Sequence, residues 1–198
     1  MNSTGLLQSG GPTLIVIILC SVMVVAFALE RWFFLAVLNK KIPALLAALQ
    51  KTPRPSVAEV DVVDVLQKPV QVLLGRRPQE SLENWRGRLH RALQETTLEL
   101  KRFLWVMATV GAMAPFLGLL GTVLGIMRSF TAMGISGKSG FNVIASGLAQ
   151  ALATTAAGIL VAIVAVVLFN YFQTKIAGIR VRLTNALDDL LDQYAEEK

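Results

Sequence analysis

Polar side chains recur at helical spacing inside two long apolar segments of this sequence. In the later segment they are four residues apart and comprise Asn142, Ser146, Gln150 and Thr154, with Thr155 on the adjoining face. Residues at this spacing share one face of a helix, and polar groups inside a membrane avoid lipid. Their hydroxyl and amide groups donate and accept hydrogen bonds without ionising at neutral pH. The stripe therefore predicts either the lining of a hydrated pathway or hydrogen bonds to a neighbouring helix.

Small residues form a second pattern. In the earlier segment glycines recur every seven residues, and one pair forms G-x-x-x-G. Small residues let helix backbones approach closely in lipid, so these positions predict helix packing. Thr122 lies on the same helix face, where a hydroxyl group can contact a pathway as well as a neighbour. The glycines expected to pack are Gly111, Gly118, Gly121, Gly125 and Gly158.

Ionisable side chains are missing from both segments. No Asp, Glu, Lys, Arg or His occurs at 103–127 or at 142–169. The first apolar segment has only the adjacent Glu30 and Arg31, near its inner end, where they are expected to pair or to extend to the membrane surface. Proton relays usually need an ionisable group near the bilayer centre, so a partner must supply it if protons cross here. No nucleophile–base pair, metal-ligand spacing or phosphate loop occurs. An enzyme, a cofactor and a metal site are therefore not expected.

Composition predicts a membrane protein. The chain is 54% hydrophobic and 16% charged with a net charge of +6, and the apolar residues gather in three blocks. Soluble domains carry about 45–50% apolar and about 25% charged residues, so soluble enzymes, disulfide scaffolds and disordered chains are excluded. The basic excess indicates membrane topology rather than nucleic-acid binding. Cys20 is expected to be a buried small hydrophobic residue, and His90 to be a solvated side chain.

The three apolar blocks predict an all-α membrane protein with transmembrane helices at 13–38, 103–127 and 142–172. About 25 helical residues at about 1.5 Å each cover the hydrocarbon core of about 30 Å with some tilt. Residues 1–12 contain no Lys or Arg, whereas 39–102 contains twelve of the nineteen. The positive-inside rule therefore predicts that the N-terminus lies outside and the long loop lies in the cytoplasm.

The remaining segments follow from this topology. The short loop 128–141 is expected outside, and the tail 173–198 is expected in the cytoplasm. Prolines at 43, 53, 55, 69 and 78 predict only short helices within 39–79, at 44–50 and 57–74. Apolar residues every three or four positions predict an amphipathic helix over 80–102 that runs straight into the second span. The same spacing extends the third span as an amphipathic tail through Ile176, Ile179, Leu183, Leu187, Leu190, Leu191 and Tyr194.

Two motifs carry a resemblance to a known family. The stretch Ala114–Met127, APFLGLLGTVLGIM, closely resembles the second-span signature of the ExbB/TolQ/MotA proton-channel subunits of the bacterial inner membrane. The stretch Gly147–Gly158, GLAQALATTAAG, resembles their third-span signature. With three spans and a modest cytoplasmic part, the chain is more similar to ExbB and TolQ than to MotA.

The resemblance implies a function and partners. Such subunits form a ring, typically a homopentamer, around a dimer of single-span ExbD/TolR-type partners that each carry a membrane Asp. Proton flow is thought to rotate the ring relative to the dimer and to transmit work across the periplasm. The hydroxyl positions of the family fall on Thr122 and Thr155, with Thr154 and Gln150 also expected to line the pathway. The N-terminus would then be periplasmic.

One departure from the family pattern keeps a second reading open. ExbB and TolQ often have Glu where this sequence has Gln150, which removes one possible titrating group. The alternative is a non-conducting membrane scaffold that holds the transmembrane helix of a partner in the same ring.

Overall fold

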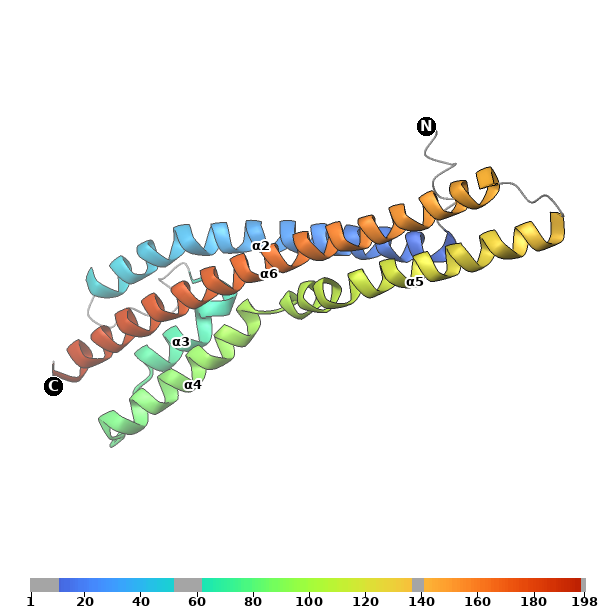
Figure 1. Cartoon of the computed structure of the whole chain (residues 1–198). Coiled ribbons are helices and arrows are strands. Elements are labelled where there is room, and N and C mark those ends of the chain that lie inside the picture. Colours follow the sequence, from blue (N-terminus) through green and yellow to red (C-terminus); the bar gives the residue numbers. More distant parts are fainter. Residues whose placement is uncertain (1–10, 52–61, 137–140, 197–198) are drawn as a thin grey trace. The chain divides into compact units, whose positions relative to one another are not determined.

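The computed structural model describes residues 11–51, 62–136 and 141–196, which contain five helices and no strand (Figure 1). The helices are α2 (Gly11–Lys51), α3 (Asp64–Leu74), α4 (Leu82–Leu100), α5 (Leu104–Ser136) and α6 (Phe141–Glu196). Three of them, α2, α5 and α6, are long and apolar enough to cross a membrane. The predicted all-α class with three candidate membrane-spanning helices is confirmed. Residues 1–10, part of the predicted N-terminal segment, lie outside the described residues.

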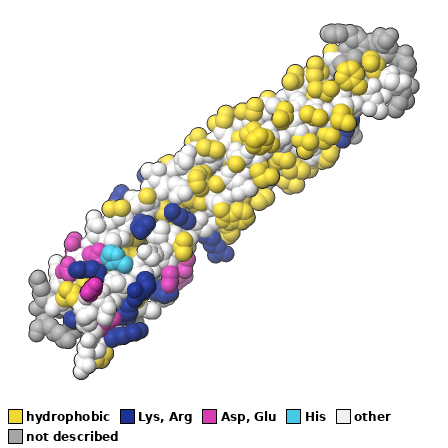
Figure 2. Space-filling model, turned by 60° about the horizontal axis from the view of Figure 1, so that its bottom comes forward, with side chains coloured by type: hydrophobic (Ala, Val, Ile, Leu, Met, Phe, Trp, Pro, Cys, Tyr) yellow, Lys and Arg dark blue, Asp and Glu magenta, His cyan; other side chains and the backbone are white. Residues whose placement is uncertain are grey.

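The described chain divides into two compact units. The apolar unit combines the chain up to Leu29 with Phe103–Asn170, and the polar unit combines Glu30–Arg102 with the chain from Tyr171 onward. On the face shown in Figure 2, hydrophobic side chains cover the apolar unit and charged side chains gather on the polar unit. Both α2 and α6 contribute a part of their length to each unit.

The apolar unit has a small core of small side chains. Val24 of α2 packs with Val110 and Ala114 of α5 and with Ala162 and Ala165 of α6. Cys20 is only partly buried, but it packs against this core as the predicted small hydrophobic residue. Large apolar side chains point outward instead, with Phe116 71% and Leu160 66% exposed. In water this exposure would be unfavourable, so the surface fits lipid or neighbouring apolar helices.

The polar unit buries the predicted amphipathic faces. In α4 the side chains of Trp85, Leu89 and Leu93 are at most 5% exposed. All seven apolar positions predicted for the tail are buried in α6, which confirms its amphipathic character. The 3.6-residue period of a helix explains this result, because residues three or four apart fall on one face.

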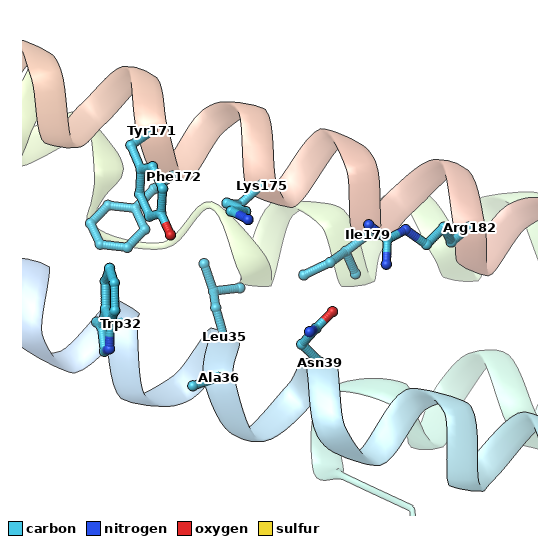
Figure 3. Close-up of a pocket in the computed structure, with 9 residues that line it drawn as sticks. All are labelled: Trp32, Leu35, Ala36, Asn39, Tyr171, Phe172, Lys175, Ile179 and Arg182. Atoms are coloured by element: carbon cyan, nitrogen blue, oxygen red, sulfur yellow. The ribbon is translucent and has the colours of Figure 1, made fainter.

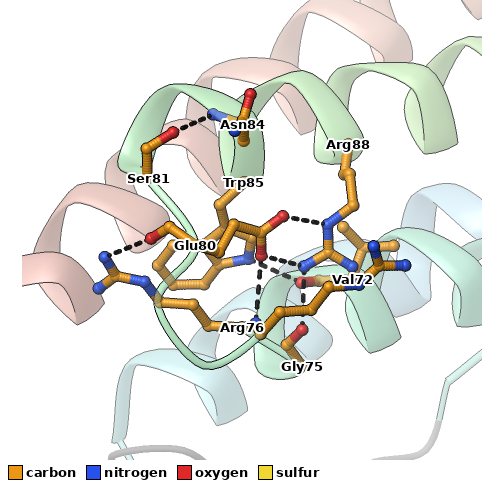
Figure 4. Close-up of polar contacts among 9 residues, drawn as sticks. Val72, Gly75, Arg76, Glu80, Ser81, Asn84, Trp85 and Arg88 are labelled. Carbon is orange, nitrogen blue, oxygen red and sulfur yellow. Dashed lines mark hydrogen bonds and ion pairs between the residues drawn. The ribbon is translucent and has the colours of Figure 1, made fainter.

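The hairpin of α3 and α4 is fixed by hydrogen bonds at its turn (Figure 4). Arg88 donates to both carboxylate oxygens of Glu80 at 2.7 and 2.6 Å and to the carbonyl of Gly75 at 3.0 Å. The indole Nε1 of the buried Trp85 donates to the carbonyl of Val72 at 2.8 Å. Ser81 caps α4 by accepting a hydrogen bond from the backbone N–H of Asn84 at 3.3 Å, as N-cap serines do.

One prediction about the proline-containing loop was wrong, and another was confirmed in part. Helix α2 does not end before Pro43 but continues to Lys51. A proline inside a helix removes one hydrogen bond, but Ile42, Leu45 and Leu49 are at most 7% exposed here, and this burial holds the helix together. Helix α3 covers Asp64–Leu74 of the helix predicted at 57–74 and contains Pro69. Residues 62 and 63 are not helical, and residues 52–61 lie outside the described residues.

The helix predicted to run straight into the second span is interrupted. Helix α4 ends at Leu100 and α5 begins at Leu104, with Phe103 at a φ of 66°. A left-handed conformation is rare for an aromatic residue. In the apolar unit the ring of Phe103 stacks on that of Phe27, with centroids 4.8 Å apart. This contact stabilises a backbone conformation that local sequence preference does not favour.

Candidate hydroxyl site between α5 and α6

Glycines bring the backbones of α5 and α6 into contact. A Cβ added at Gly158 would lie 2.5 Å from the carbonyl oxygen of Ala114 and 3.0 Å from the Cα of Gly118. A Cβ added at Gly118 would in turn lie 2.9 Å from the Cα of Thr155. Distances this short leave no room for a side chain, so the two helices can approach this closely only with glycine at both positions.

The other three predicted packing glycines also face neighbouring helices. A Cβ at Gly111 would lie 2.7 Å from a methyl group of Val166, and one at Gly125 would lie 2.6 Å from the Cβ of Ala151. At Gly121 it would lie 2.5 Å from the methyl group of Thr154 and 3.0 Å from the hydroxyl oxygen of Thr13 in α2. The glycine face of α5 therefore contacts α6 along several turns and reaches α2 at Gly121.

Two hydroxyl groups meet at this close approach. The Oγ1 atoms of Thr122 in α5 and Thr155 in α6 are 3.1 Å apart. Thr122 donates to the carbonyl of Leu119 in its own helix at 2.7 Å, while Thr155 donates across the helix contact to the carbonyl of Gly118 at 2.8 Å. Thr155 reaches this carbonyl because Gly118 and Gly158 admit the neighbouring backbone.

The hydrogen bonds of this pair define its chemistry. A hydroxyl group has one proton to donate and two lone pairs to accept. Thr122 and Thr155 each donate to a backbone carbonyl, so the lone pairs of their oxygens can accept a hydrogen bond from another donor. Alternatively, one hydroxyl group can rotate and donate its hydrogen bond to the other. Rotation passes a hydrogen bond along the pair, but neither group stores a charge at neutral pH. A titrating group must therefore come from elsewhere.

The other two predicted pathway residues, Thr154 and Gln150, differ in their burial. Thr154 is only 2% exposed, and its hydroxyl donates to the carbonyl of Gln150 at 3.2 Å while its methyl group packs on Gly121. The side chain of Gln150 is exposed on the surface of the single chain. A contribution of Thr154 or Gln150 to a pathway stays a prediction. The side chain of Asn142 lies outside the described residues.

The comparison with known families decides the family of the chain. The sequence profile described as the MotA/TolQ/ExbB proton channel family matches residues 59–185, which include the hydroxyl pair and all five packing glycines. The chain belongs to this family. It is a family of channels and not of enzymes, and its match agrees with the three apolar helices of a multi-pass membrane protein.

Individual members of the MotA/TolQ/ExbB family give the same result. The chain is 39% identical over 104 residues to "Biopolymer transport protein ExbB" of Pseudomonas putida, covering 52% of this chain and 32% of that protein. It is 33% identical over 131 residues to the ExbB of Salmonella typhimurium, covering 66% and 54%. A "Putative biopolymer transport protein ExbB-like 3" of Synechocystis is 29% identical over 178 residues, covering 84% and 83%. The chain thus spans about a third to a half of the length of the first two relatives.

One further contact of the α5–α6 interface was missed from the sequence. Ser129 of α5 is 9% exposed and donates to the carbonyl of Gly125 at 2.9 Å, and a Cβ added at Gly147 would clash with its hydroxyl oxygen. Its distance of seven residues from Thr122 places both on one face of a helix. That spacing is the sequence signal that would have found it.

The polar unit of this family member contains a buried charge that the sequence only partly predicted. Arg31 is 4% exposed and pairs with the carboxylate of its neighbour Glu30 through two bonds of 2.6 and 2.8 Å. It also donates to the carbonyls of Leu100 at 3.2 Å and Glu99 at 3.4 Å. The pairing with Glu30 agrees with the sequence reading. The contact with the last carbonyls of α4 was not foreseen, and it favours a positive charge at this helix end.

His90 differs from the expectation of a purely solvated side chain. Its Nε2 lies 3.0 Å from the carboxylate oxygens of Asp188 in α6. Arg86, one turn earlier in α4, pairs with Asp192 one turn later in α6. These contacts join α4 and α6 within the polar unit. No group of three or more His, Cys, Asp or Glu side chains in the described part of the chain is placed to hold a metal ion.

Proposed function

We propose that the chain is a ring-forming subunit of an inner-membrane motor that is driven by the proton-motive force. The observation that carries the proposal is the 3.1 Å contact between the Thr122 and Thr155 hydroxyls, within spans that contain no ionisable residue. This pair offers hydrogen bonds to a proton-carrying group without trapping a charge itself. The membership in a proton-channel family supports the same assignment.

The titrating group would come from a partner of the ExbD/TolR type. Such a partner crosses the membrane once and carries an Asp in its span. A protonated Asp carboxyl group can donate to a threonine oxygen, and an ionised one can accept from a threonine hydroxyl. Since hydrogen bonds to charged groups are stronger than those to neutral groups, the pair would stabilise the ionised carboxylate and so favour the release of its proton.

The assembly and the orientation are part of the proposal. We expect a homopentamer around a dimer of the partner, with the N-terminus in the periplasm and the C-terminus in the cytoplasm. The exposed apolar side chains of α5, such as Met113 and Phe116, offer surface for neighbouring subunits or lipid. The basic residues of the polar unit support its cytoplasmic placement by the positive-inside rule.

The test is the replacement Thr155→Val in the complex reconstituted with its partner in liposomes. Valine keeps the shape of threonine but removes the hydroxyl group. We expect proton flux to fall about ten- to a hundredfold, since a hydrogen bond to a charged group contributes about 1.5–3 kcal/mol and about 1.4 kcal/mol is tenfold. The matched control is Thr131→Val, because this exposed hydroxyl donates only to the carbonyl of Met127 in its own helix.

The outcomes separate a channel from a scaffold. If Thr155→Val and Thr131→Val conduct as well as the unmodified chain, the hydroxyl pair has no role in proton transfer. A partner whose membrane Asp is replaced with Asn provides the second comparison. Equal flux with and without the carboxylate would support the non-conducting scaffold and refute the motor.

A further inference from the structure

A hollow of about 220 Å³ lies between α2 and α6 within the polar unit (Figure 3). Trp32 of α2 and Tyr171 of α6 stack at one end, with ring centroids 5.8 Å apart. Lys175 and Arg182 of α6 also line the hollow, and Figure 3 shows the guanidinium group of Arg182 reaching back along the helix toward Lys175. The lining contains no acidic residue. The hollow therefore combines an aromatic wall with an uncompensated positive charge.

These two cations differ from several basic residues of the polar unit that form ion pairs. Lys68, Arg86 and Arg88 each pair with an acidic side chain. Neither Lys175 nor Arg182 has such a partner among residues 11–51, 62–136 and 141–196; the ammonium group of Lys175 lies 5.6 Å from the centre of the Tyr171 ring. An anion that enters the hollow would gain two charge contacts without first breaking an ion pair.

The position of the hollow along the chain indicates the source of such an anion. Trp32 and Tyr171 lie near the predicted inner ends of the first and third spans, 13–38 and 142–172. Tryptophan and tyrosine favour the headgroup level of a bilayer at such positions. Lys175 follows Tyr171 by one helical turn, which is a rise of about 6 Å. The charges therefore begin where the hydrocarbon core ends and phospholipid phosphates lie.

We propose that this hollow binds the headgroup of an anionic phospholipid. The phosphodiester group contacts Lys175 and Arg182, and the side chain of Asn39 offers hydrogen bonds to headgroup hydroxyls. The aromatic wall of Trp32 and Tyr171 packs against the glycerol and the first methylene groups. Basic pockets between transmembrane helices at the inner membrane surface are suited to anionic headgroups. The proposal requires α2 and α6 to cross the membrane and does not depend on proton conduction.

The test compares phosphatidylglycerol with phosphatidylcholine of the same acyl chains, added to the purified full-length complex and measured by native mass spectrometry. The pocket variant is Lys175→Gln with Arg182→Gln. The control is Lys40→Gln with Arg180→Gln, which removes two exposed charges from the same two helices without altering the lining. We expect the pocket variant to bind phosphatidylglycerol about ten- to thirtyfold more weakly, and the control to change it less than about twofold. Binding of phosphatidylcholine should stay the same in both.

Several outcomes would overturn the proposal. An equal loss in the control variant would mean that general surface charge attracts the lipid. Inorganic phosphate that binds as tightly as phosphatidylglycerol would identify a site for free anions. A pocket variant that keeps phosphatidylglycerol but changes the number of subunits in the complex would show that a neighbouring chain occupies the hollow.

Discussion

The replacement Gly158→Ala tests whether close backbone contact creates the hydroxyl site. The new methyl group would lie 2.5 Å from the carbonyl oxygen of Ala114, whereas ordinary contacts begin at 3.4 Å. Because the opposing atoms belong to the backbone, α5 and α6 must separate locally by about 0.9 Å to relieve the clash. A separation of that size would lengthen the 3.1 Å contact between Thr122 and Thr155 to about 4.0 Å, beyond hydrogen-bond distance.

The energetic consequence can be estimated from the same geometry. Overpacking a helix contact destabilises by about 1–3 kcal/mol, and loss of the Thr155 bond to the Gly118 carbonyl adds about 0.5–1.5 kcal/mol. The better helix propensity of alanine offsets about 1 kcal/mol. The net expectation is a decrease of about 0.5–3.5 kcal/mol in the free energy of unfolding.

The matched control is Gly178→Ala in the same helix. No atom lies within 4 Å of a Cβ added at Gly178, so the substitution should stabilise the chain by up to about 1 kcal/mol. Denaturant unfolding in mixed micelles, followed by helical circular dichroism, measures both variants, and reconstituted liposomes measure proton flux. Equal or greater stability of Gly158→Ala with unchanged flux would refute the claim that α5 and α6 depend on contact at this glycine.

Two further predictions concern the polar unit. Arg31→Gln should lower the free energy of unfolding by about 2–4 kcal/mol, because it leaves the carbonyls at the end of α4 without their charged donor; an unchanged unfolding midpoint would contradict this cap. The Arg88 guanidinium holds the pKa of Glu80 below its ordinary value of 4.5. A carboxyl group with a lowered pKa stabilises the fold above its unfolded-state pKa, and this stabilisation is lost as the pH falls through the lowered value. The unfolding midpoints of Glu80→Gln and the unmodified chain should therefore differ at pH 7 and converge below pH 4.5, and a constant difference would contradict the pairing.

Much of the architecture was predictable because apolar periodicity is a local property. The lengths of the apolar blocks predicted α2, α5 and α6 as membrane-crossing helices, and spacing of three to four residues predicted the buried faces of α4 and of the α6 tail. The proline rule failed at Pro43, since the burial of Ile42, Leu45 and Leu49 stabilises the helix around it. Propensity describes an isolated segment, and packing within the unit outweighs it here.

The candidate site was predictable in its residue types but not in its pairing. The sequence indicated Thr122, Thr155 and the glycine faces, yet it grouped Thr154 with Gln150 as one polar stripe. The structure buries Thr154 and exposes Gln150. Residues four apart on a helix are offset by about 40° around its axis, so a stripe at this spacing does not stay on one face. Which residues of the stripe contact α5 depends on where the glycines allow the two helix backbones to approach each other.

The sequence by itself determined the membrane class, the three apolar helices and the lack of an ionisable group in the second and third spans, because hydropathy and residue type are readable without a partner. Tertiary structure decided which hydroxyls meet. It also decided that Arg31 caps α4 and that the chain breaks at Phe103 rather than continuing as a helix. These features join residues that are distant in the sequence or require a backbone conformation that only packing stabilises, so no local pattern specifies them.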